Sequence, residues 1–253
     1  MPDLGMFEDM DNKLFISFEG GEGFGKTTQI RLLFNRLADE YPWIKVLMVR
    51  DPGGTAIGEK LRNLLKFDPD GNKMSTMTEL LLFCASRAQL VHEVIRPHLD
   101  AGGIVIADRF HDSTIAYQHA GRGLPLEYVV GVTDATNGGT VPGTTFLLDM
   151  PTEMGKARIN SRLPEARIPD RMEQEQEAFY HRVRISYLRS AAFNPQRIVT
   201  LNADREASAV AEEVWNQFQT RIGVPCKLRS QERQEAGRKN SSSWGAGSIG
   251  DER

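Results

Sequence analysis

The sequence predicts an α/β fold in which a five-stranded parallel sheet is flanked by helices. Five short apolar runs are typical of buried strands, and text with helical spacing of its apolar residues follows each run. Strands that alternate with helices favour parallel pairing, with helices on both faces of the sheet. The chain has 253 residues, 40% of them hydrophobic, which is enough for one sizeable core.

Each expected strand is a run of four or five mostly apolar residues. A central strand of a parallel sheet is covered on both faces, so its sequence is continuously apolar rather than alternating. Glycines or charged residues end most of these runs and mark the turns that follow. The expected strands are Leu14–Phe18, Val46–Val49, Ile104–Ala107, Thr145–Leu148 and Arg197–Leu201.

Helices are expected between the strands, where apolar residues recur three and four positions apart. The turn-forming segment 68–72 and the pair Gly102-Gly103 separate neighbouring elements. The first helix carries Ile30, Leu33, Phe34 and Leu37, and the last carries Ala209, Val210, Val214 and Phe218. The others are expected at about Thr55–Lys66, Met77–Leu99, Ser113–Gln118, Leu126–Thr136, Thr152–Arg162 and Arg171–Ala192.

The expected organisation is one domain at 13–223 with a polar segment at each end. Residues 1–12 are acidic and contain no apolar run, which excludes a secretory signal, so a flexible extension is expected there. Residues 224–253 are rich in serine, glycine and charge and cannot bury enough surface to order themselves, so they are expected to be disordered. The two cysteines lack metal-site spacing and fit free thiols in the cytoplasm.

The bulk charge excludes some classes of partner. A formal net charge of -3 gives no strong field toward nucleic acid or an anionic membrane. No stretch approaches the length of an apolar membrane span. A locally basic site for anionic nucleotides remains compatible with this balance.

Residues 20–27, GGEGFGKT, fit the phosphate-binding pattern G-x-x-x-x-G-K-[ST] between a buried strand and an amphipathic helix. The glycines let backbone N–H groups surround a polyphosphate at a helix N-terminus. Lys26 is expected to bridge the outer phosphates of ATP, and the Thr27 hydroxyl to ligate Mg²⁺. The expected ATP-binding residues are Gly20, Gly21, Glu22, Gly23, Phe24, Gly25, Lys26, Thr27 and Thr28. The motif alone does not separate kinases from GTPases or motor ATPases.

Asp108 and Arg109 end the third strand. Ligands of parallel sheets collect at the carboxyl ends of the strands, so both side chains are expected beside the phosphate-binding loop. Asp108 can hold Mg²⁺ directly or through water, and Arg109 can pair with phosphate oxygens.

Three further features suggest a pocket for a phosphate acceptor. Arg50 follows the second strand and precedes two glycines that permit close backbone approach. Phe83 and Arg87 are four residues apart on one helical face that also carries apolar residues, where a guanidinium needs an acceptor. Ser113, Tyr117 and Gln118 follow Asp108 within one helical stretch.

With these residues in place, the sequence resembles the bacterial-type thymidylate kinases over nearly all of 13–223. The signatures are FEGGEGFGKTTQ, RDPGGT, LLFCASRAQL, DRFHDSTIAYQHAGRG, FLLDMP and PDRME. The resemblance implies the nucleotide-kinase architecture of P-loop NTPases with a short lid, in a homodimer. It also implies an enzyme that transfers the γ-phosphate of MgATP to dTMP, with both nucleotides bound end to end.

Residue roles follow from the resemblance position by position. Glu22 is similar to the acidic residue that faces the sugar 3′-hydroxyl of dTMP, and Tyr117 to the aromatic residue that crowds the 2′ position. Phe83 resembles the thymine-stacking residue. The remaining roles are a donor to a thymine carbonyl for Arg87, further base-edge contacts for Ser113 and Gln118, and clamps on the acceptor phosphate for Arg50 and Arg109.

The family's mobile lid corresponds to about 158–171. Phe24 stands where some members place a basic residue, so the resemblance implies that a lid arginine, Arg162 or Arg167, supplies the catalytic cation. A cation that closes over the transferring phosphoryl group stabilises its transition state. The sequence does not choose between the two positions. Asp51 departs from the family's usual Glu, which leaves its role open.

Three alternative functions stand beside this interpretation. Another nucleotide or nucleoside kinase could use the same scaffold with a different acceptor. A GTP-binding switch protein is disfavoured because neither Asn12-Lys13 nor Asn72-Lys73 continues to the N-K-x-D guanine motif. A P-loop module without catalytic activity is disfavoured by the intact Lys26, Thr27 and Asp108.

Overall fold

The computed structural model describes residues 10–162 and 170–223. Its centre is a five-stranded sheet in which every strand pair is parallel, as the sequence predicts. The strands lie in the order β2-β3-β1-β4-β5. Their bounds are Phe15–Glu19 for β1, Val46–Arg50 for β2, Ile104–Asp108 for β3, Thr144–Asp149 for β4 and Ile198–Asn202 for β5.

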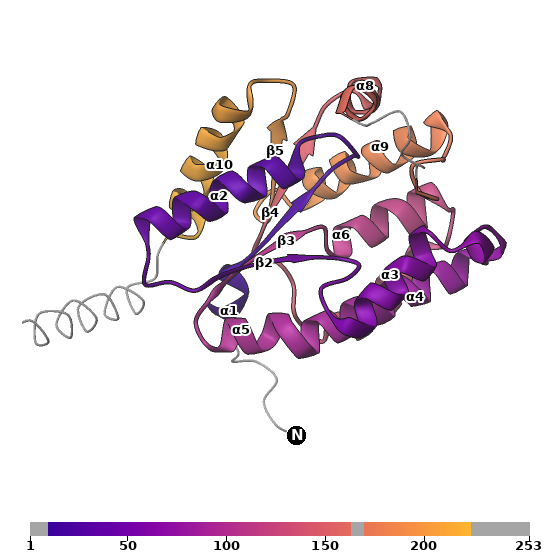
Figure 1. Ribbon diagram of the computed structural model, residues 1–253, viewed down its shortest axis with the longest axis horizontal. Helices are drawn as coiled ribbons and strands as arrows, with labels where there is room; N and C mark the ends of the chain where they lie inside the picture. The colour runs from indigo at the N-terminus through magenta and orange to yellow at the C-terminus, as the bar shows by residue number, and fades with distance from the viewer. Residues whose placement is uncertain (1–9, 163–169, 224–253) are drawn as a thin grey trace, which may run out of the picture.

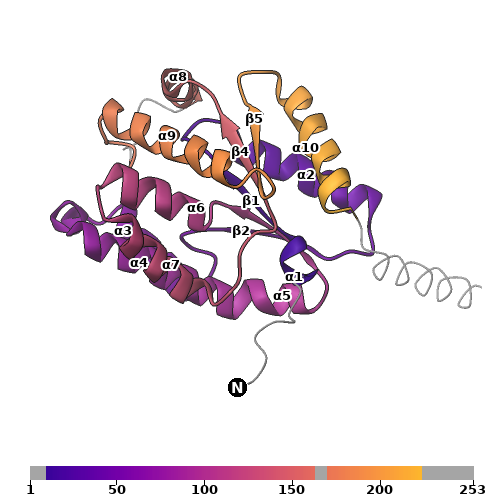
Figure 2. The same ribbon diagram turned by 180° about the vertical axis from the view of Figure 1, so that it is seen from behind.

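Helices cover both faces of this sheet (Figures 1 and 2). The helices α2 and α10 pack together on one face, whereas α5, α6 and α9 lie on the other. The helical elements are α1 Met10–Lys13, α2 Lys26–Glu40, α3 Ala56–Lys66, η1 Pro69–Lys73, α4 Thr76–Leu90, η2 Val91–Ile95, α5 Arg96–Asp100, α6 His111–Thr114, η3 Ile115–Gly121, α7 Leu126–Asn137, α8 Thr152–Arg162, α9 Glu177–Phe193 and α10 Ala207–Arg221. In the described ranges, no helix is long and apolar enough to cross a membrane.

The strand order decides where the functional side chains meet. Because β3 lies between β2 and β1, the carboxyl ends of these three strands are neighbours. In the register of the sheet, Asp108 of β3 lies opposite Arg50 of β2 on one side and opposite Phe18 of β1 on the other. Fully buried phenylalanines on β1 and β4 hold the middle of the sheet in the core. The segments after β1, β2 and β3 therefore converge on one edge of the molecule.

Three expected helices differ from the structure. The helix expected at Ser113–Gln118 runs from His111 to Gly121, as α6 and the π-helical element η3. The helix expected from Met77 to Leu99 runs as α4, a π-helical turn η2 and α5, so it is helical throughout but not one regular α-helix. The helix expected from Arg171 begins only at Glu177, which makes its predicted start wrong. Asp170 explains this, because its carboxylate accepts hydrogen bonds from the backbone N–H groups of Met172 and Glu173 and holds a turn there.

The ends of the chain are described only in part. The short helix α1 lies in what the sequence suggested was a flexible extension, and the Asn12 carbonyl accepts a hydrogen bond from the Gly143 N–H at 2.9 Å. The expectations for residues 1–9 and 224–253 fall outside the described residues.

Candidate active site

The phosphate-binding loop joins β1 to α2 in a conformation that needs its glycines. Gly20, Gly23 and Gly25 have φ values of 128°, 76° and 92°, a region that other residues rarely adopt. A Cβ on Gly20 would lie 2.3 Å from the Leu148 carbonyl oxygen, so this residue also has no space for a side chain. Gly25 caps α2, which leaves the first N–H groups of that helix free for an anion.

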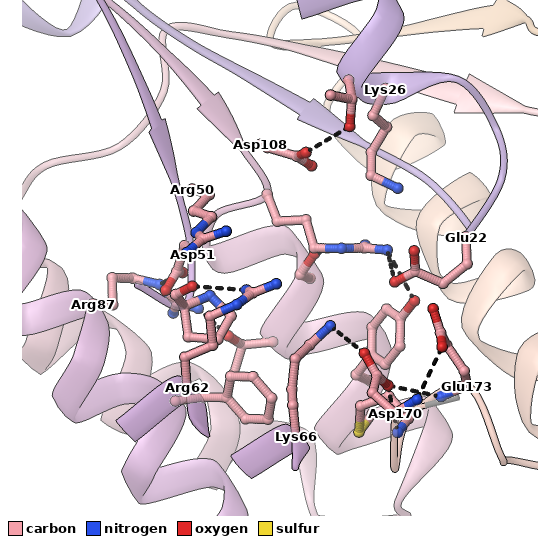
Figure 3. Close-up of a pocket in the computed structure, with 18 of the residues that line it drawn as sticks. Glu22, Lys26, Arg50, Asp51, Arg62, Lys66, Arg87, Asp108, Asp170 and Glu173 are labelled. Atoms are coloured by element: carbon pink, nitrogen blue, oxygen red, sulfur yellow. Dashed lines mark hydrogen bonds and ion pairs between the residues drawn. The ribbon is translucent and has the colours of Figure 1, made fainter. Parts of the chain in front are cut away.

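Lys26 and Asp108 lie at this loop (Figure 3), and Thr27 joins them, as the sequence predicts. The Thr27 hydroxyl donates to Asp108 Oδ2 at 3.3 Å across the gap between α2 and β3. Lys26 Nζ donates to the carbonyls of Gly20 and Gly21 at 3.2 and 2.8 Å, which holds the ammonium inside the loop. Burial lowers the pKa of Lys26, and the neighbouring Arg109 lowers it further.

A cavity of about 400 Å³ extends from the loop and is lined by all of the predicted acceptor residues. Six Lys or Arg side chains and five carboxylates line it, so its lining is net positive although the chain carries -3. The predicted residues along it are Glu22, Gly23, Gly25, Lys26, Thr27, Thr28, Arg50, Phe83, Arg87, Asp108, Arg109, Ser113, Tyr117 and Gln118. An anionic ligand is therefore favoured here.

Arg109 connects several side chains at the end of the cavity next to the phosphate-binding loop. Its backbone has a φ of 71°, the one positive value among the non-glycine residues that the structure describes. Its guanidinium donates to Glu22 at 2.9 Å, to Tyr117 Oη at 3.2 Å and to Ser113 Oγ at 3.2 Å. Burial alone would raise the pKa of Glu22, but Arg109 and Lys26 hold it well below its usual value. The sequence predicted each of these residues as part of the site, but it did not predict that one guanidinium forms hydrogen bonds with all three partners.

Sequence reasoning missed two residues that hold Arg109 in place. Glu19, the last residue of β1, is fully buried and accepts hydrogen bonds from the Phe110 N–H at 2.7 Å and Ser113 Oγ at 2.6 Å. Tyr187 on α9 donates to the same carboxylate at 3.0 Å and accepts from Arg109 at 3.1 Å. A charged residue that ends an apolar strand was the available signal for Glu19. Tyr187 carried no such signal, because its helical spacing is that of a core residue.

Arg87 and Asp51 form a buried ion pair at the far end of the cavity. Arg87 Nε donates to Asp51 Oδ2 at 2.6 Å, and Nη2 donates to the Thr114 hydroxyl. Arg87 Nη1 is buried without a hydrogen-bond partner among the described residues, although the side chain lines the cavity. Burial raises the pKa of Asp51, and the pairing with Arg87 opposes that rise. The contact of Asp51, whose role the sequence left open, is thus with Arg87.

Phe83 and Gln118 complete this end. Phe83 is half-buried on α4, one turn before Arg87, so both lie on the face that the spacing predicted. Gln118 is buried in the π-helical turn η3, and its Nε2 donates to Glu79 Oε1 at 3.0 Å. The cavity thus ends in an aromatic ring, a guanidinium and a carboxamide.

The rim contains cations that sequence reasoning did not single out. Arg62 and Lys66 are four residues apart on α3, where both side chains face the cavity (Figure 3). Lys66 pairs with Asp170 at 2.7 Å, and Arg62 donates to the Pro52 carbonyl at 2.9 Å. Arg50 is half exposed and pairs with Glu59 at 2.7 Å. The helical spacing on α3 was the signal that could have found the first two.

The lid positions are described only in part. Phe24 is buried in the core against α8, so its side chain offers nothing to a bound phosphate and its contribution to the loop is that of its backbone. Arg158 donates to the Ala203 carbonyl at 3.1 Å. Arg162 ends α8, but its side chain lies outside what the structure describes, as does all of Arg167.

Comparison with known proteins agrees with this geometry. The family model described as "Thymidylate kinase" matches residues 18–214. The chain belongs to the thymidylate kinase family. It is 44% identical over 209 residues to the thymidylate kinase of a Synechococcus strain, covering 83% of this chain and 96% of that protein. It is 43% identical over 213 residues to the thymidylate kinase of Syntrophotalea carbinolica, covering 83% and 97%.

A solved member of the thymidylate kinase family supports the fold. The crystal structure of thymidylate kinase from Ehrlichia chaffeensis superposes with a TM-score of 0.65 at 35% identity, covering 81% of this chain and 97% of that one. The five-stranded parallel sheet is therefore that of the P-loop kinases in this family. Family membership makes the chain a nucleotide-binding kinase and disfavours a GTP switch or an inactive binding module.

Proposed function

We propose that this chain transfers the γ-phosphate of MgATP to dTMP, giving ADP and dTDP for the synthesis of dTTP. The observation that carries the proposal is one continuous cavity with two different ends. One end is a phosphate-binding loop with Lys26, and the other presents Phe83, Arg87 and Gln118. A nucleoside triphosphate and a pyrimidine monophosphate can therefore meet phosphate to phosphate.

The residues at the loop fit Mg²⁺. The Thr27 hydroxyl and the Asp108 carboxylate are hard oxygen donors close to one another and open to solvent. Mg²⁺ prefers a few protein oxygens together with water and phosphate, so this small donor set suits it better than a closed cage. When bound, the ion neutralises charge on the phosphates of ATP.

The chemistry needs positioning and charge more than a side-chain base. An oxygen of the dTMP phosphate forms the new bond to the γ-phosphorus, and the bond to the β–γ bridging oxygen breaks with its electrons left on ADP. The acceptor phosphate is already an anionic nucleophile. Lys26 and Arg109 flank the place where both phosphates meet and stabilise the charge that develops there.

The remaining cation is assigned to the lid. The phosphate-binding loop contains no arginine, and the side chain of Phe24 is buried away from the phosphate site. We assign the role to Arg162 or Arg167, with Arg162 favoured slightly because it adjoins the helix that anchors the segment. A lid that closes over ATP also excludes water, which protects the phosphoryl group from hydrolysis.

The far end suits thymine. Phe83 offers a ring face for stacking, and the free N–H of Arg87 Nη1 suits a carbonyl oxygen of the base. Ser113 lies along the path toward the base. Tyr117 packs against Arg109, with the guanidinium 5.2 Å from its ring centroid, where it can restrict the 2′ position of the sugar. We assign Glu22 to the 3′-hydroxyl of the sugar and Arg50 to the acceptor phosphate, and both side chains line the cavity.

The proposed assembly is a homodimer in the cytoplasm. Large apolar side chains of α4 and α7 are exposed in the single chain, namely Met77, Leu81, Leu126 and Tyr128. These two helices pack side by side, so the four residues belong to one region of the surface. A second copy of the chain is the proposed cover for it.

An acceptor profile tests the activity. ADP release is measured by a coupled assay with each common ribo- and deoxyribonucleoside monophosphate at matched concentration. We expect dTMP to be the best acceptor, dUMP weaker and purine monophosphates very poor. Faster turnover of dGMP or CMP than of dTMP would refute the assignment and favour another nucleoside-monophosphate kinase on this scaffold.

A further inference from the structure

Glu79 on α4 is a buried carboxylate that the proposed reaction does not use. It is 2% exposed, and three side chains from other segments converge on it. Gln118 Nε2 and Arg122 Nε each donate to its Oε1 at 3.0 Å, and Arg171 pairs with its Oε2 at 2.6 Å. A buried carboxylate with this many donors is held in one orientation.

The charge on Glu79 dictates how its neighbours point. Burial alone would raise the pKa of Glu79, but the hydrogen bond and charge of Arg122, with further help from Gln118 and Arg171, lower it below its usual value. The group is therefore ionised at neutral pH and can only accept hydrogen bonds.

Gln118 has one amide group and two ways to place it. With Nε2 toward Glu79, the amide donates to a carboxylate. With the amide reversed, Oε1 would face an anionic oxygen about 3 Å away, and the hydrogen bond would become a repulsion. The charge of Glu79 thus selects the first orientation. No residue that the structure describes donates to Gln118 Oε1, and the side chain lines the cavity.

We propose that Glu79 is a positioning residue that fixes the amide of Gln118 and thereby makes the site prefer thymine over cytosine. The inference rests on the proposed function, because it assumes that the far end of the cavity holds the base. Glu79 itself does not touch the nucleotide; it acts through Gln118.

Thymine and cytosine differ in the hydrogen-bond donors and acceptors that would face Arg87 and Gln118. Thymine carries a donor at N3–H beside an acceptor at O4, whereas cytosine carries an acceptor at N3 beside a donor amino group. Arg87 Nη1 can only donate, so it matches O4 and opposes the amino group. A fixed Gln118 Oε1 matches N3–H and opposes the bare N3 of cytosine. An amide free to reverse would remove the second distinction but not the first.

Glu79→Asp separates this role from a purely structural one. The shorter side chain keeps the charge for Arg122 and Arg171, whose long side chains can follow it, but withdraws the oxygen from Gln118. We expect the ratio of kcat/KM for dTMP to that for dCMP to fall by about tenfold, the scale of one mispaired buried hydrogen bond. Most of the change should appear in KM rather than kcat. Where dCMP turnover is too slow, its inhibition constant against dTMP replaces it.

Glu175→Asp is the matched control. Glu175 also pairs with Arg122, so the variant shortens a carboxylate in the same network, but it makes no hydrogen bond to Gln118. We expect its dTMP to dCMP ratio to equal that of the unaltered chain within about twofold. A fall as large as that of Glu79→Asp would overturn the proposal, because general loosening would then explain both.

A variant that lacks the Gln118 amide completes the test. In Gln118→Leu, adding Glu79→Asp should leave the ratio unchanged, since the residue through which Glu79 acts is gone. Glu79→Met, with similar size and no acceptor, should lower the ratio further than Glu79→Asp if it folds. An unaltered ratio in Glu79→Asp refutes the role of Glu79 alone. Failure of the unaltered chain to prefer dTMP refutes the proposed function instead.

Discussion

Glu19 ends β1 and Glu22 lies three residues later in the phosphate-binding loop, yet their carboxyl groups have opposite electrostatic surroundings. Glu22 faces Arg109 and Lys26, which keep its pKa far below its usual value. Glu19 is sealed in the sheet, where burial and repulsion from Asp112 raise its pKa from 4.5 to about 7, while Arg109 only partly opposes the shift. Burial without a dedicated cation explains the difference.

This difference predicts a pH-dependent stability. In the unfolded chain Glu19 ionises near its usual value of 4.5, but in the folded chain it ionises near 7. Its contribution to stability is therefore fully present below pH 4.5 and is lost as the pH rises to about 7. The loss amounts to roughly 3 kcal/mol at most, from about 1.4 kcal/mol for each unit of pKa shift.

Glu19→Gln removes this dependence, because an amide does not ionise. We expect the free energy of unfolding of the variant minus that of the unaltered chain to be more positive at pH 8 than at pH 5, because only the unaltered chain loses stability over this range. Urea unfolding curves at both pH values measure the difference. The amide keeps one acceptor oxygen and replaces the other with a donor, so the hydrogen bonds from the Phe110 N–H or from Ser113 and Tyr187 change, but they change in the variant at both pH values alike. A pH-independent difference would contradict the elevated pKa.

Sequence reasoning found residues whose chemistry is visible in a motif and missed those whose role depends on packing. Lys26 and Asp108 could be placed because a loop pattern and a strand end fix their positions. Glu79 could not, since its partners Gln118, Arg122 and Arg171 are 39, 43 and 92 residues away along the chain. The strand that carries Glu19 was predicted one residue too early, which left that carboxylate outside the predicted element.

At the scale of elements, α8 is seated directly on the phosphate-binding loop. A Cβ on Gly155 would lie 2.6 Å from the Glu22 carbonyl oxygen, and a Cβ on Gly23 would lie 2.3 Å from the Gly155 carbonyl oxygen. Two glycines thus let a helix and a loop touch through their backbones. Because α8 leads to the proposed lid arginines, this contact fixes the helix from which the proposed lid would extend.

Gly155→Ala should disturb the site although it lies in a helix that favours alanine. The added methyl group cannot fit without moving α8 or the loop, since its neighbour is backbone rather than a flexible side chain. We expect kcat to fall by at least about tenfold, as misplacement of a catalytic element commonly does. Steady-state kinetics and a thermal unfolding curve on the same preparation measure the two effects.

Gly131→Ala is the corresponding control. Gly131 lies within α7, and a Cβ there would meet nothing within 4 Å. This variant should leave kcat unchanged and stabilise the protein by about 0.5–1 kcal/mol through helix propensity. Equal kinetic effects of the two substitutions would show that the contact between α8 and the loop does not matter for turnover.

At the scale of the whole molecule, the pattern of apolar residues was sufficient to predict the strands of the sheet, but it did not predict where every helix begins. The apolar runs placed five strands to within about one residue at each end, because covered parallel strands leave a continuous apolar signature. The start of α9 was misplaced because Asp170 favours a turn over a helix, and apolar spacing does not register that competition. The strand order was not evident from periodicity and was not predicted; the structure supplies it.

The comparisons cover most of the chain up to the last described helix. The family model ends at residue 214, and about 209 residues of this chain account for 96% of the Synechococcus relative. The helix α10 closes the core with Val210, Val214, Trp215 and Phe218, all buried, and ends at Arg221. The sequence after Lys227 contains few apolar residues that could extend this core.

We therefore expect a chain that ends at Lys227 to keep its fold and its activity. The removed residues are polar enough that their loss should expose little apolar surface, so the melting temperature should change by no more than a few degrees. The value of kcat/KM for dTMP should stay within about threefold. A second truncation after Asp204 provides the contrast, because it also removes α10 and uncovers the apolar side chains of β5 and α2 that α10 covers. That shorter chain should not fold. If the first truncation is folded but inactive, residues 228–253 contribute to the active site or to the proposed dimer, and the catalytic unit extends beyond the family's core.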